Sequence, residues 1–253
     1  MPSQRVNFTN DQGIQLAGIL DMPTGTPKAF ALFSHCFTCT KDLKGIVRIS
    51  RGLAKHNIAV LRFDFTGLGD SQGDFSETNI QTNLADVAAA AKWLRTEHES
   101  PQLLIGHSLG GAAMMASVNS IETTKCIATL AAPSCTKHLA GFLDKQNPDI
   151  NALGVGQVTI GGTTHTMRKQ LLESLAEFDL KAQIEQIKLP HLILHSPADE
   201  TLAFRHAEDL FAWTAGPKSL ITLDGSDHLF VNRPEDVTYV ADLIATWARR
   251  WLG

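Results

Sequence analysis

The stretch L-L-I-G-H-S-L-G-G-A-A-M-M-A-S, residues 103–117, decides the fold class. It starts as a short apolar run that suits a buried strand, and its end suits a helix. Between them lies G-x-S-x-G, the pattern that sets a serine on a sharp strand-to-helix turn. Gly106 and Gly110 leave space for the turn, so Ser108 is predicted to sit exposed at its tip.

Similar apolar runs recur along the chain and alternate with helical patterns. Such runs suit strands buried on both faces of a parallel sheet. They begin at Ala29, Ile58, Leu103, Ile127, Leu192 and Ser219. Helical spacing joins Ile80, Leu84, Val87, Ala91 and Leu94, and then Val237, Val240, Ile244, Trp247 and Trp251 in a last helix that begins near Pro234. The sequence therefore predicts an α/β fold with a mostly parallel central sheet flanked by helices.

Two segments depart from this rhythm. The runs at 6–8 and 14–20 have no helix between them and predict an antiparallel lead-in. Residues 134–189 lack a convincing buried strand and offer two short helices and a hairpin around Gly161-Gly162. We interpret the chain as one domain over residues 1–253, with a small lid or cap inserted at about 134–189.

Composition excludes several classes of function. Hydrophobic residues make up 43% and charged residues 19% of the 253 residues, as in an average soluble protein. The net charge is −4 with no run of Lys or Arg, so neither nucleic acid nor a membrane is an expected partner. The first residues lack the apolar core of a signal peptide, so we expect a cytoplasmic protein with its four cysteines reduced.

Residues that could activate Ser108 follow it in the order acid, then histidine. Asp199 comes just after the run at 192–195, and His228 lies in a loop before the last helix. A serine hydroxyl needs a base and a group that orients that base, and open α/β sheets assemble sites at the carboxyl ends of their strands. We therefore predict Ser108, Asp199 and His228 as catalytic residues.

Other acids and histidines are weaker candidates. Glu200 adjoins Asp199, but the spacing to Leu202 favours Asp199 as the acid at the end of the strand. Asp227 is a sequence neighbour of His228 and is poorly placed to orient its imidazole. We expect His195 to be a core residue and His165 to be a surface residue. His107 lies inside the G-x-S-x-G turn, so we expect it to shape the turn and the substrate pocket rather than act as a base.

Four segments together resemble the α/β-hydrolase superfamily. They are S-H-C-F-T-C-T-K-D, R-F-D-F-T-G-L-G-D-S-Q-G-D-F, G-H-S-L-G-G-A-A and H-S-P-A-D-E. The combination looks most like the hydrolase half of bacterial hydrolase–OsmC fusion proteins and extends along essentially the whole chain. This chain ends at Trp251-Leu252-Gly253, so we expect no OsmC-like half and carry over no peroxide chemistry.

The resemblance assigns roles to two loops. It implies that the backbone N–H groups of Phe37 and Leu109 form an oxyanion hole, with Cys36 where many relatives carry glycine. Cys36 and Cys39 are then packing residues, although their C-x-x-C spacing also occurs in redox and metal sites. Asp64, Gly67, Gly69 and Ser71 become a structural loop rather than a nucleotide loop, so we expect no cofactor and no metal.

The predicted function is hydrolysis of carboxylic esters with short or medium acyl groups through an acyl-serine. Candidate pocket walls in the insertion are Leu139, Phe142, Leu143, Leu175 and Phe178, although packing against the core would also require apolar residues there. A thioesterase, amidase or peptidase would use the same three residues. A binding module for a separate OsmC-like protein is the alternative outside enzymes. The expected ligand is a small-molecule ester, and oligomeric state stays open.

Overall fold

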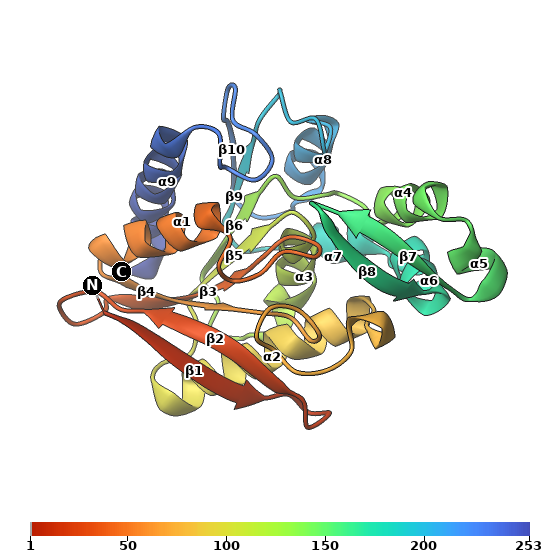
Figure 1. Ribbon diagram of the computed structural model, residues 1–253. Helices are drawn as coiled ribbons and strands as arrows, with labels where there is room; N and C mark the ends of the chain where they lie inside the picture. Colours follow the sequence, from red (N-terminus) through yellow and green to blue (C-terminus); the bar gives the residue numbers. More distant parts are fainter. Residues whose placement is uncertain (1) are drawn as a thin grey trace.

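Across residues 2–253, which this computed structural model describes, eight strands form the central sheet in the order β1-β2-β4-β3-β5-β6-β9-β10 (Figure 1). Its strands are β1 Ser3–Thr9, β2 Gln15–Asp21, β3 Ala29–Ser34, β4 Ile58–Phe63, β5 Leu103–His107, β6 Cys126–Leu130, β9 His191–His195 and β10 Lys218–Thr222. β1 and β2 are antiparallel to their neighbours, and all other pairs are parallel. The predicted fold and its antiparallel lead-in are confirmed.

The strands are continuously apolar because both faces of the sheet are covered. In β3, Ala31 and Phe33 join the core cluster on one face, whereas Phe30 and Leu32 join the cluster on the other. Successive side chains of a strand point to opposite faces, so both sets must be apolar. The prediction of full burial is wrong for β10, which is only partly buried because it is the last strand of the sheet.

Helices cover the two faces in two groups. α1 Lys44–Lys55 and α9 Pro234–Leu252 pack on one face. α2 Ile80–Glu97, α3 Leu109–Ser117 and α8 Arg205–Trp213 pack on the other (Figure 1). The predicted helical stripes are confirmed, although Leu84, Trp247 and Trp251 are only half-buried. Between residues 2 and 253, no helix is both long and apolar enough to cross a lipid bilayer.

The segment from residue 134 to 189 lies between β6 and β9 and forms a separate group beside the sheet (Figure 1). It contains α4 Lys137–Gln146, α5 Asp149–Leu153, β7 Val155–Ile160, β8 Thr163–Arg168, α6 Lys169–Glu177 and α7 Leu180–Glu185. Gly161 and Gly162 both have positive φ, as a tight two-residue hairpin turn requires. This confirms the predicted hairpin.

Polar contacts attach this segment to the short 3₁₀ helix η1, Phe75–Glu77. Arg168 lies 2.9 Å from the Glu77 carboxylate, and Gln170 Nε2 donates to the Ser76 carbonyl at 2.8 Å. The η1 helix follows β4, so residues 134–189 contact a loop at the carboxyl end of the sheet. A second 3₁₀ helix, η2 Val118–Ser120, extends α3.

Candidate active site

Ser108 lies on a strained turn between β5 and α3. Its φ of 52° and ψ of −126° belong to a region that residues with a side chain rarely adopt. Such strain persists only where the surroundings hold it, and it clusters at functional sites. A Cβ atom on Gly106 would lie 2.5 Å from the Gly110 carbonyl oxygen, so glycine is required for the turn to close. The expected exposed tip is half-buried.

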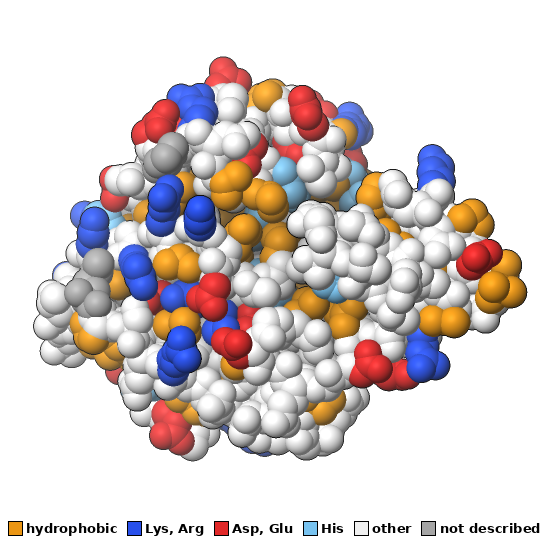
Figure 2. All heavy atoms as spheres, viewed as in Figure 1, with side chains coloured by type: hydrophobic (Ala, Val, Ile, Leu, Met, Phe, Trp, Pro, Cys, Tyr) orange, Lys and Arg blue, Asp and Glu red, His pale blue; other side chains and the backbone are white. Residues whose placement is uncertain are grey.

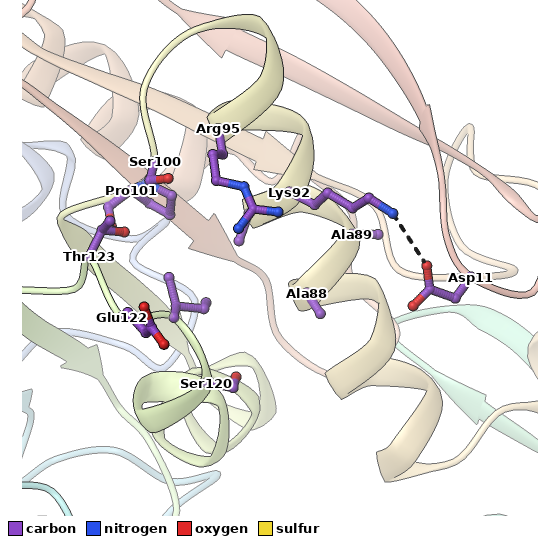
Figure 3. A pocket seen from close by; sticks show the side chains of 12 residues that line it. Asp11, Ala88, Ala89, Lys92, Arg95, Ser100, Pro101, Ser120, Glu122 and Thr123 are labelled. Carbon is purple, nitrogen blue, oxygen red and sulfur yellow. Dashed lines mark hydrogen bonds and ion pairs between the residues drawn. The ribbon is translucent and has the colours of Figure 1, made fainter.

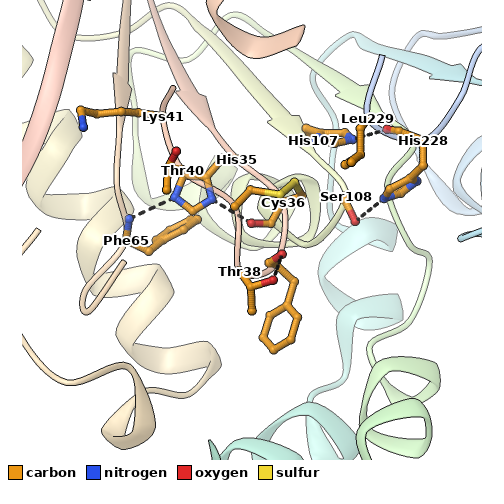
Figure 4. Close-up of a disulfide and its surroundings, with 12 residues drawn as sticks. His35, Cys36, Thr38, Thr40, Lys41, Phe65, His107, Ser108, His228 and Leu229 are labelled. Atoms are coloured by element: carbon orange, nitrogen blue, oxygen red, sulfur yellow. Dashed lines mark hydrogen bonds between the residues drawn. A yellow bond between two sulfur atoms is a disulfide. The ribbon is translucent and has the colours of Figure 1, made fainter. Parts of the chain in front are cut away.

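The structure brings Ser108, His228 and Asp199 together in one hydrogen-bonded chain. His228 Nε2 lies 3.1 Å from Ser108 Oγ, and His228 Nδ1 lies 2.7 Å from Asp199 Oδ2. A carboxylate can only accept, so Nδ1 carries the proton and Nε2 is free to accept from the serine hydroxyl. Figure 4 shows Ser108 and His228 pointing at each other. This is the arrangement that a general base needs next to a nucleophile.

Asp199 is held as a carboxylate by its surroundings. Its Oδ1 accepts hydrogen bonds from the backbone N–H groups of Thr201 at 2.8 Å and Leu202 at 2.9 Å. Burial by itself raises the pKa of Asp199, but the hydrogen bond and charge of His228 together with the two N–H donors bring that pKa below its ordinary value. The side chain therefore stays ionised and can stabilise a charged imidazole.

His107 supports the loop that carries His228 and does not line the cavity beside Ser108. Its Nε2 donates to the His228 carbonyl oxygen at 2.7 Å, and its ring also packs against Phe230. The side chain is 1% exposed, which corrects its assignment to the substrate pocket. The expected role of His107 in shaping the turn stays a prediction.

Two buried histidines should make the protein less stable in acid. Burial lowers the pKa of His107 and of His191 from 6.5 to about 3. Between pH 6.5 and about pH 3, these two histidines are protonated in the unfolded chain but neutral in the folded chain. As the pH is lowered through this range, the free energy of unfolding should therefore decrease by about 1.4 kcal/mol per pH unit for each histidine. Urea unfolding between pH 7 and pH 4 measures this slope.

His191→Gln is the matched variant for this measurement. The neutral His191 ring pairs with the hydroxyls of Thr129 at 2.9 Å and Thr214 at 3.0 Å, and an amide can form similar bonds without titrating. Its pH slope should be shallower than that of the wild type by about 1.4 kcal/mol per pH unit. Equal slopes in the two proteins would contradict this assignment.

Hydrogen bonds of His35 hold the loop after β3, which carries Phe37. His35 Nδ1 donates to the Cys36 carbonyl at 2.8 Å, and the Phe65 N–H approaches His35 Nε2 at 3.3 Å. Burial lowers the pKa of His35, which keeps this ring neutral. No peptide bond in the described chain is cis, so the Phe37 N–H points away from the Cys36 carbonyl and its histidine. His35, Cys36 and Phe37 all line one small cavity.

The same loop is attached directly to the turn that carries the serine. Ser34 Oγ donates to the Gly110 carbonyl at 2.8 Å, and a Cβ on Gly110 would collide with the backbone of Ser34. Phe37 and Leu109 line one cavity, and within the described chain neither N–H has a hydrogen-bond acceptor. Backbone N–H groups without an acceptor can stabilise an oxyanion when they point at the reacting carbonyl oxygen.

Cys36 and Cys39 form a disulfide, which corrects the expectation that all four cysteines are reduced (Figure 4). The four-residue turn brings their Cα atoms to 5.3 Å, within the range of about 4.4–6.8 Å that a disulfide can bridge. The Cys39 N–H also donates to the Cys36 carbonyl at 3.2 Å. Cys126 and Cys135 are free thiols, the first buried and the second half-buried.

A buried ion cluster fixes the far end of this loop. Lys41 is 3% exposed, and its Nζ lies 2.7 Å from Asp64 and 2.6 Å from Asp70. Asp64 also accepts from the backbone N–H groups of Lys41 and Asp70. Gly67 and Gly69 have positive φ, and Ser71 Oγ donates to the Asp64 carbonyl. The loop after β4 thus braces the site, as expected, whereas sequence reasoning missed Lys41.

The cavity beside the two free N–H groups is small and aromatic. It is lined by His35, Cys36, Phe37, Thr38, Phe65, Leu68, Phe75, Thr78, Asn83, Leu109 and Leu171. Its volume of about 10 Å³ is close to what one water needs. Sequence reasoning missed Phe65 and Leu68, which lie in the loop after β4, and Phe75, which lies in η1.

The five apolar candidates in the 134–189 segment lie elsewhere. Leu143 and Leu175 are fully buried in the core, as the packing alternative predicts. Leu139 and Phe178 pack against this core at intermediate exposure, and Phe142 is 44% exposed. None of the five lines the cavity beside Leu109. Figure 2 shows the molecule from the same side as Figure 1. Hydrophobic and histidine side chains gather there in a central hollow beside this segment.

The weaker acids and histidines have structural roles. Glu200 is exposed, and the Asp227 carboxylate accepts from backbone N–H groups of its own loop. His195 is fully buried and donates from Nε2 to the Leu202 carbonyl. His165 is not the surface residue that we expected, because its ring packs edge-on against Phe75 at 5.3 Å.

A second serine–histidine pair lies outside the site. Ser134 Oγ is 2.9 Å from His206 Nδ1, and the Ser134 N–H donates to the same nitrogen at 3.1 Å. The lone pair of Nδ1 is therefore already engaged by the backbone. Burial, together with the nearby His138 and His195, lowers the pKa of His206 to about 4. Ser134 is 1% exposed, so a substrate has no access to this pair.

A larger groove of about 520 Å³ lies at the other end of the sheet (Figure 3). Pro101 and Thr123 line it just before β5 and β6 begin, whereas Ser108 follows the end of β5. Its charged residues include Lys92, which lies 3.8 Å from Asp11. Open α/β sheets bind their ligands at the carboxyl ends of the strands, so we assign the chemistry to the Ser108 site.

Comparisons with known proteins agree with this geometry. A model of the Alpha/beta hydrolase family matches residues 30–238. The esterase domain of a Rhodothermus marinus protein, whose crystal structure is known, is 38% identical with a TM-score of 0.81 and covers 100% of both chains. Est1E from Butyrivibrio proteoclasticus, solved with ferulic acid bound, has a TM-score of 0.85 over 98% of this chain and 99% of its own. Its identity of 18% bears on the fold alone.

A sequence relative also aligns over most of the chain. YfhR from Escherichia coli O157:H7 is 26% identical over 242 residues, which is 93% of this chain and 77% of YfhR. The family match and the esterase domain thus support a hydrolase with esterase-type activity.

Proposed function

Because the chain belongs to the alpha/beta hydrolase family, we propose that it is a carboxylesterase with Ser108 as its nucleophile. One observation carries this proposal: Ser108 Oγ lies 3.1 Å from an imidazole that is itself 2.7 Å from the Asp199 carboxylate. The esterase domain that is 38% identical over the full chain supports ester hydrolysis as the reaction.

In the proposed reaction, His228 Nε2 accepts the Ser108 proton while Oγ attacks the acyl carbonyl. The carbonyl oxygen becomes an oxyanion, which the N–H groups of Phe37 and Leu109 stabilise. The imidazolium returns its proton to the departing alcohol, leaving an acyl-serine. A water then loses its proton to His228 and attacks the acyl carbon. The imidazolium gives this proton to Ser108 Oγ as the acyl–oxygen bond breaks, which releases the acid and restores the serine. Asp199 stays ionised and stabilises the imidazolium in both halves.

The small size of the cavity lined by Phe37 argues against long acyl groups as substrates. Phe37 and Phe75 contact each other at 5.8 Å between ring centroids and leave about 10 Å³ of space. A longer chain would have to displace these rings or the 134–189 segment that packs beside them. We therefore propose that this segment acts as a lid whose position limits the acyl chain.

A series of p-nitrophenyl esters tests the proposal. We expect kcat/KM to be highest for acetate or butyrate and to fall for octanoate and dodecanoate, because the longer chains do not fit. Rapid mixing should show a burst of p-nitrophenol equal in amount to the enzyme, since the acyl-serine accumulates when deacylation is slower. Release of p-nitrophenol measures both quantities.

The leaving group needs its own comparison. Thioester and anilide analogues with the same acyl group distinguish an esterase from a thioesterase or an amidase, since the three share one acyl-serine. If the enzyme accelerated acylation by the thioester more than acylation by the ester, each relative to its uncatalysed hydrolysis, the protein would be assigned as a thioesterase instead. No turnover of any of the three analogues would contradict the serine hydrolase itself.

A further inference from the structure

We propose that the Cys36–Cys39 disulfide is a reducible site, and that a dithiol reductant acting on it slows acyl transfer at Ser108. This inference rests on the proposed function, because its effect is expressed at the oxyanion hole. The disulfide closes the segment that contains Phe37 (Figure 4). Cys36 and Leu109 line the same cavity. The cross-link therefore lies beside a proposed catalytic donor.

The backbone inside the cross-link needs to be held. Thr38 has a φ of 57°, in the left-handed region that a β-branched residue seldom adopts. A tight turn with this residue at its third position favours glycine there. The Cys39 N–H to Cys36 carbonyl bond of 3.2 Å holds the turn, and the disulfide joins the same two residues covalently. Without the disulfide, more open conformations of the turn become accessible.

The effect of reduction should stay within this turn. On one side, Ser34 is bonded to Gly110, and on the other, Lys41 is held by Asp64. Both anchors are independent of the cysteines, so Ser108 and the sheet keep their positions. The freedom released by reduction falls on residues 36–40, which include the Phe37 N–H. An oxyanion donor must be fixed before the charge develops, so its mobility lowers kcat.

The disulfide is accessible to a reductant from one side. Cys36 is 4% exposed, whereas Cys39 is half-buried. A thiolate of the reductant attacks Cys39 Sγ, which breaks the disulfide and releases Cys36 as a thiolate that takes up a proton. The second thiol of the reductant then attacks the reductant sulfur that is bonded to Cys39 Sγ in the mixed disulfide, and Cys39 leaves as a thiol. Two electrons pass from the dithiol to the protein, and the reductant leaves as a disulfide.

The test compares oxidised and reduced wild type. The protein is treated with dithiothreitol, freed of reductant without oxygen because thiols cleave p-nitrophenyl esters, and assayed with p-nitrophenyl acetate. We expect kcat to fall by about 10-fold or more, toward the 10²–10³ that losing one donor costs, with KM nearly unchanged. Reoxidation should restore kcat. Alkylation of the protein after unfolding without reductant, followed by mass measurement, should find two free thiols in the oxidised chain and four in the reduced chain.

Two variants control for other effects of the reductant. Cys36→Ser/Cys39→Ser should have the low kcat of the reduced enzyme and no response to dithiothreitol. Its circular dichroism and thermal unfolding show whether it folds. Cys135→Ser removes a free thiol outside the loop and should respond as the wild type does.

The possible contrary results are separable. Four alkylated thiols with an unchanged or higher kcat would overturn the proposal while leaving the esterase function intact. A disulfide that resists dithiothreitol in the folded protein, or is absent before treatment, would also overturn it. Absence of hydrolysis in both redox states would contradict the proposed function, and this inference with it.

Discussion

Ser108→Ala is expected to lower kcat for ester hydrolysis by roughly 10⁶-fold, the loss that follows removal of a nucleophile in a serine triad. The physical reason is that no other hydroxyl lies next to His228 Nε2 in the hydrogen-bonded chain of the described residues. The turn itself should survive, because alanine has the same Cβ as serine. Steady-state hydrolysis of p-nitrophenyl acetate and labelling with a fluorophosphonate measure this loss.

Ser134→Ala is the matched control for this substitution. Ser134 is another buried serine beside a histidine, but its His206 nitrogen already accepts a backbone hydrogen bond. Activity should therefore stay close to wild type. The double variant Ser108→Ala/His228→Ala should be no slower than Ser108→Ala, because the two residues act as one unit. Loss of activity and labelling in Ser134→Ala instead would move the nucleophile to Ser134.

Asp199→Asn is expected to lower kcat by about 10⁴-fold with little change in KM. The asparagine oxygen can keep the backbone hydrogen bonds from Thr201 and Leu202, so its NH₂ group would face His228 Nδ1. The imidazole must then carry its proton on Nε2, pointing at the serine instead of accepting from it. Steady-state kinetics give kcat and KM separately.

Glu200→Gln controls for the loss of one negative charge at the same loop. Glu200 is exposed and adjoins Asp199, so its removal should leave kcat nearly unchanged. Similar kcat values for Asp199→Asn and the wild type would show that another group orients His228. A large loss in Glu200→Gln would instead favour the neighbouring acid.

The strands and the order of the site residues could be predicted because they depend on local sequence. Parallel strands buried on both faces must be apolar throughout. The runs at Ala29, Ile58 and Leu103 could therefore be identified as strands from the sequence. The turn at Ser108 needs glycine on both sides, so its pattern was also local. His228 was found through its position after the last strand, in a loop before the last helix.

The walls of the pocket could not be predicted, because apolar residues in a core and in a cavity look the same in a sequence. Leu143 and Leu175 have the apolar side chains of a pocket but pack in the core. Phe75 lines the cavity because the 3₁₀ helix η1 brings it against Phe37. No periodic pattern of apolar residues in the sequence predicts this contact. The reduced state expected for Cys36 and Cys39 was wrong, because the composition and the spacing of cysteines do not show whether two thiols meet in the fold.

The sequence by itself determined the α/β architecture, the nucleophile turn and the order of Ser108, Asp199 and His228. Each of these follows from the chain's own periodicity or from the steric demands of a few adjacent residues. Only the tertiary structure decided the hydrogen bonds that join the three residues, the ion cluster around Lys41 and the closure of the Cys36–Cys39 turn. These depend on distances between segments far apart in the chain, which are set by packing across the whole sheet.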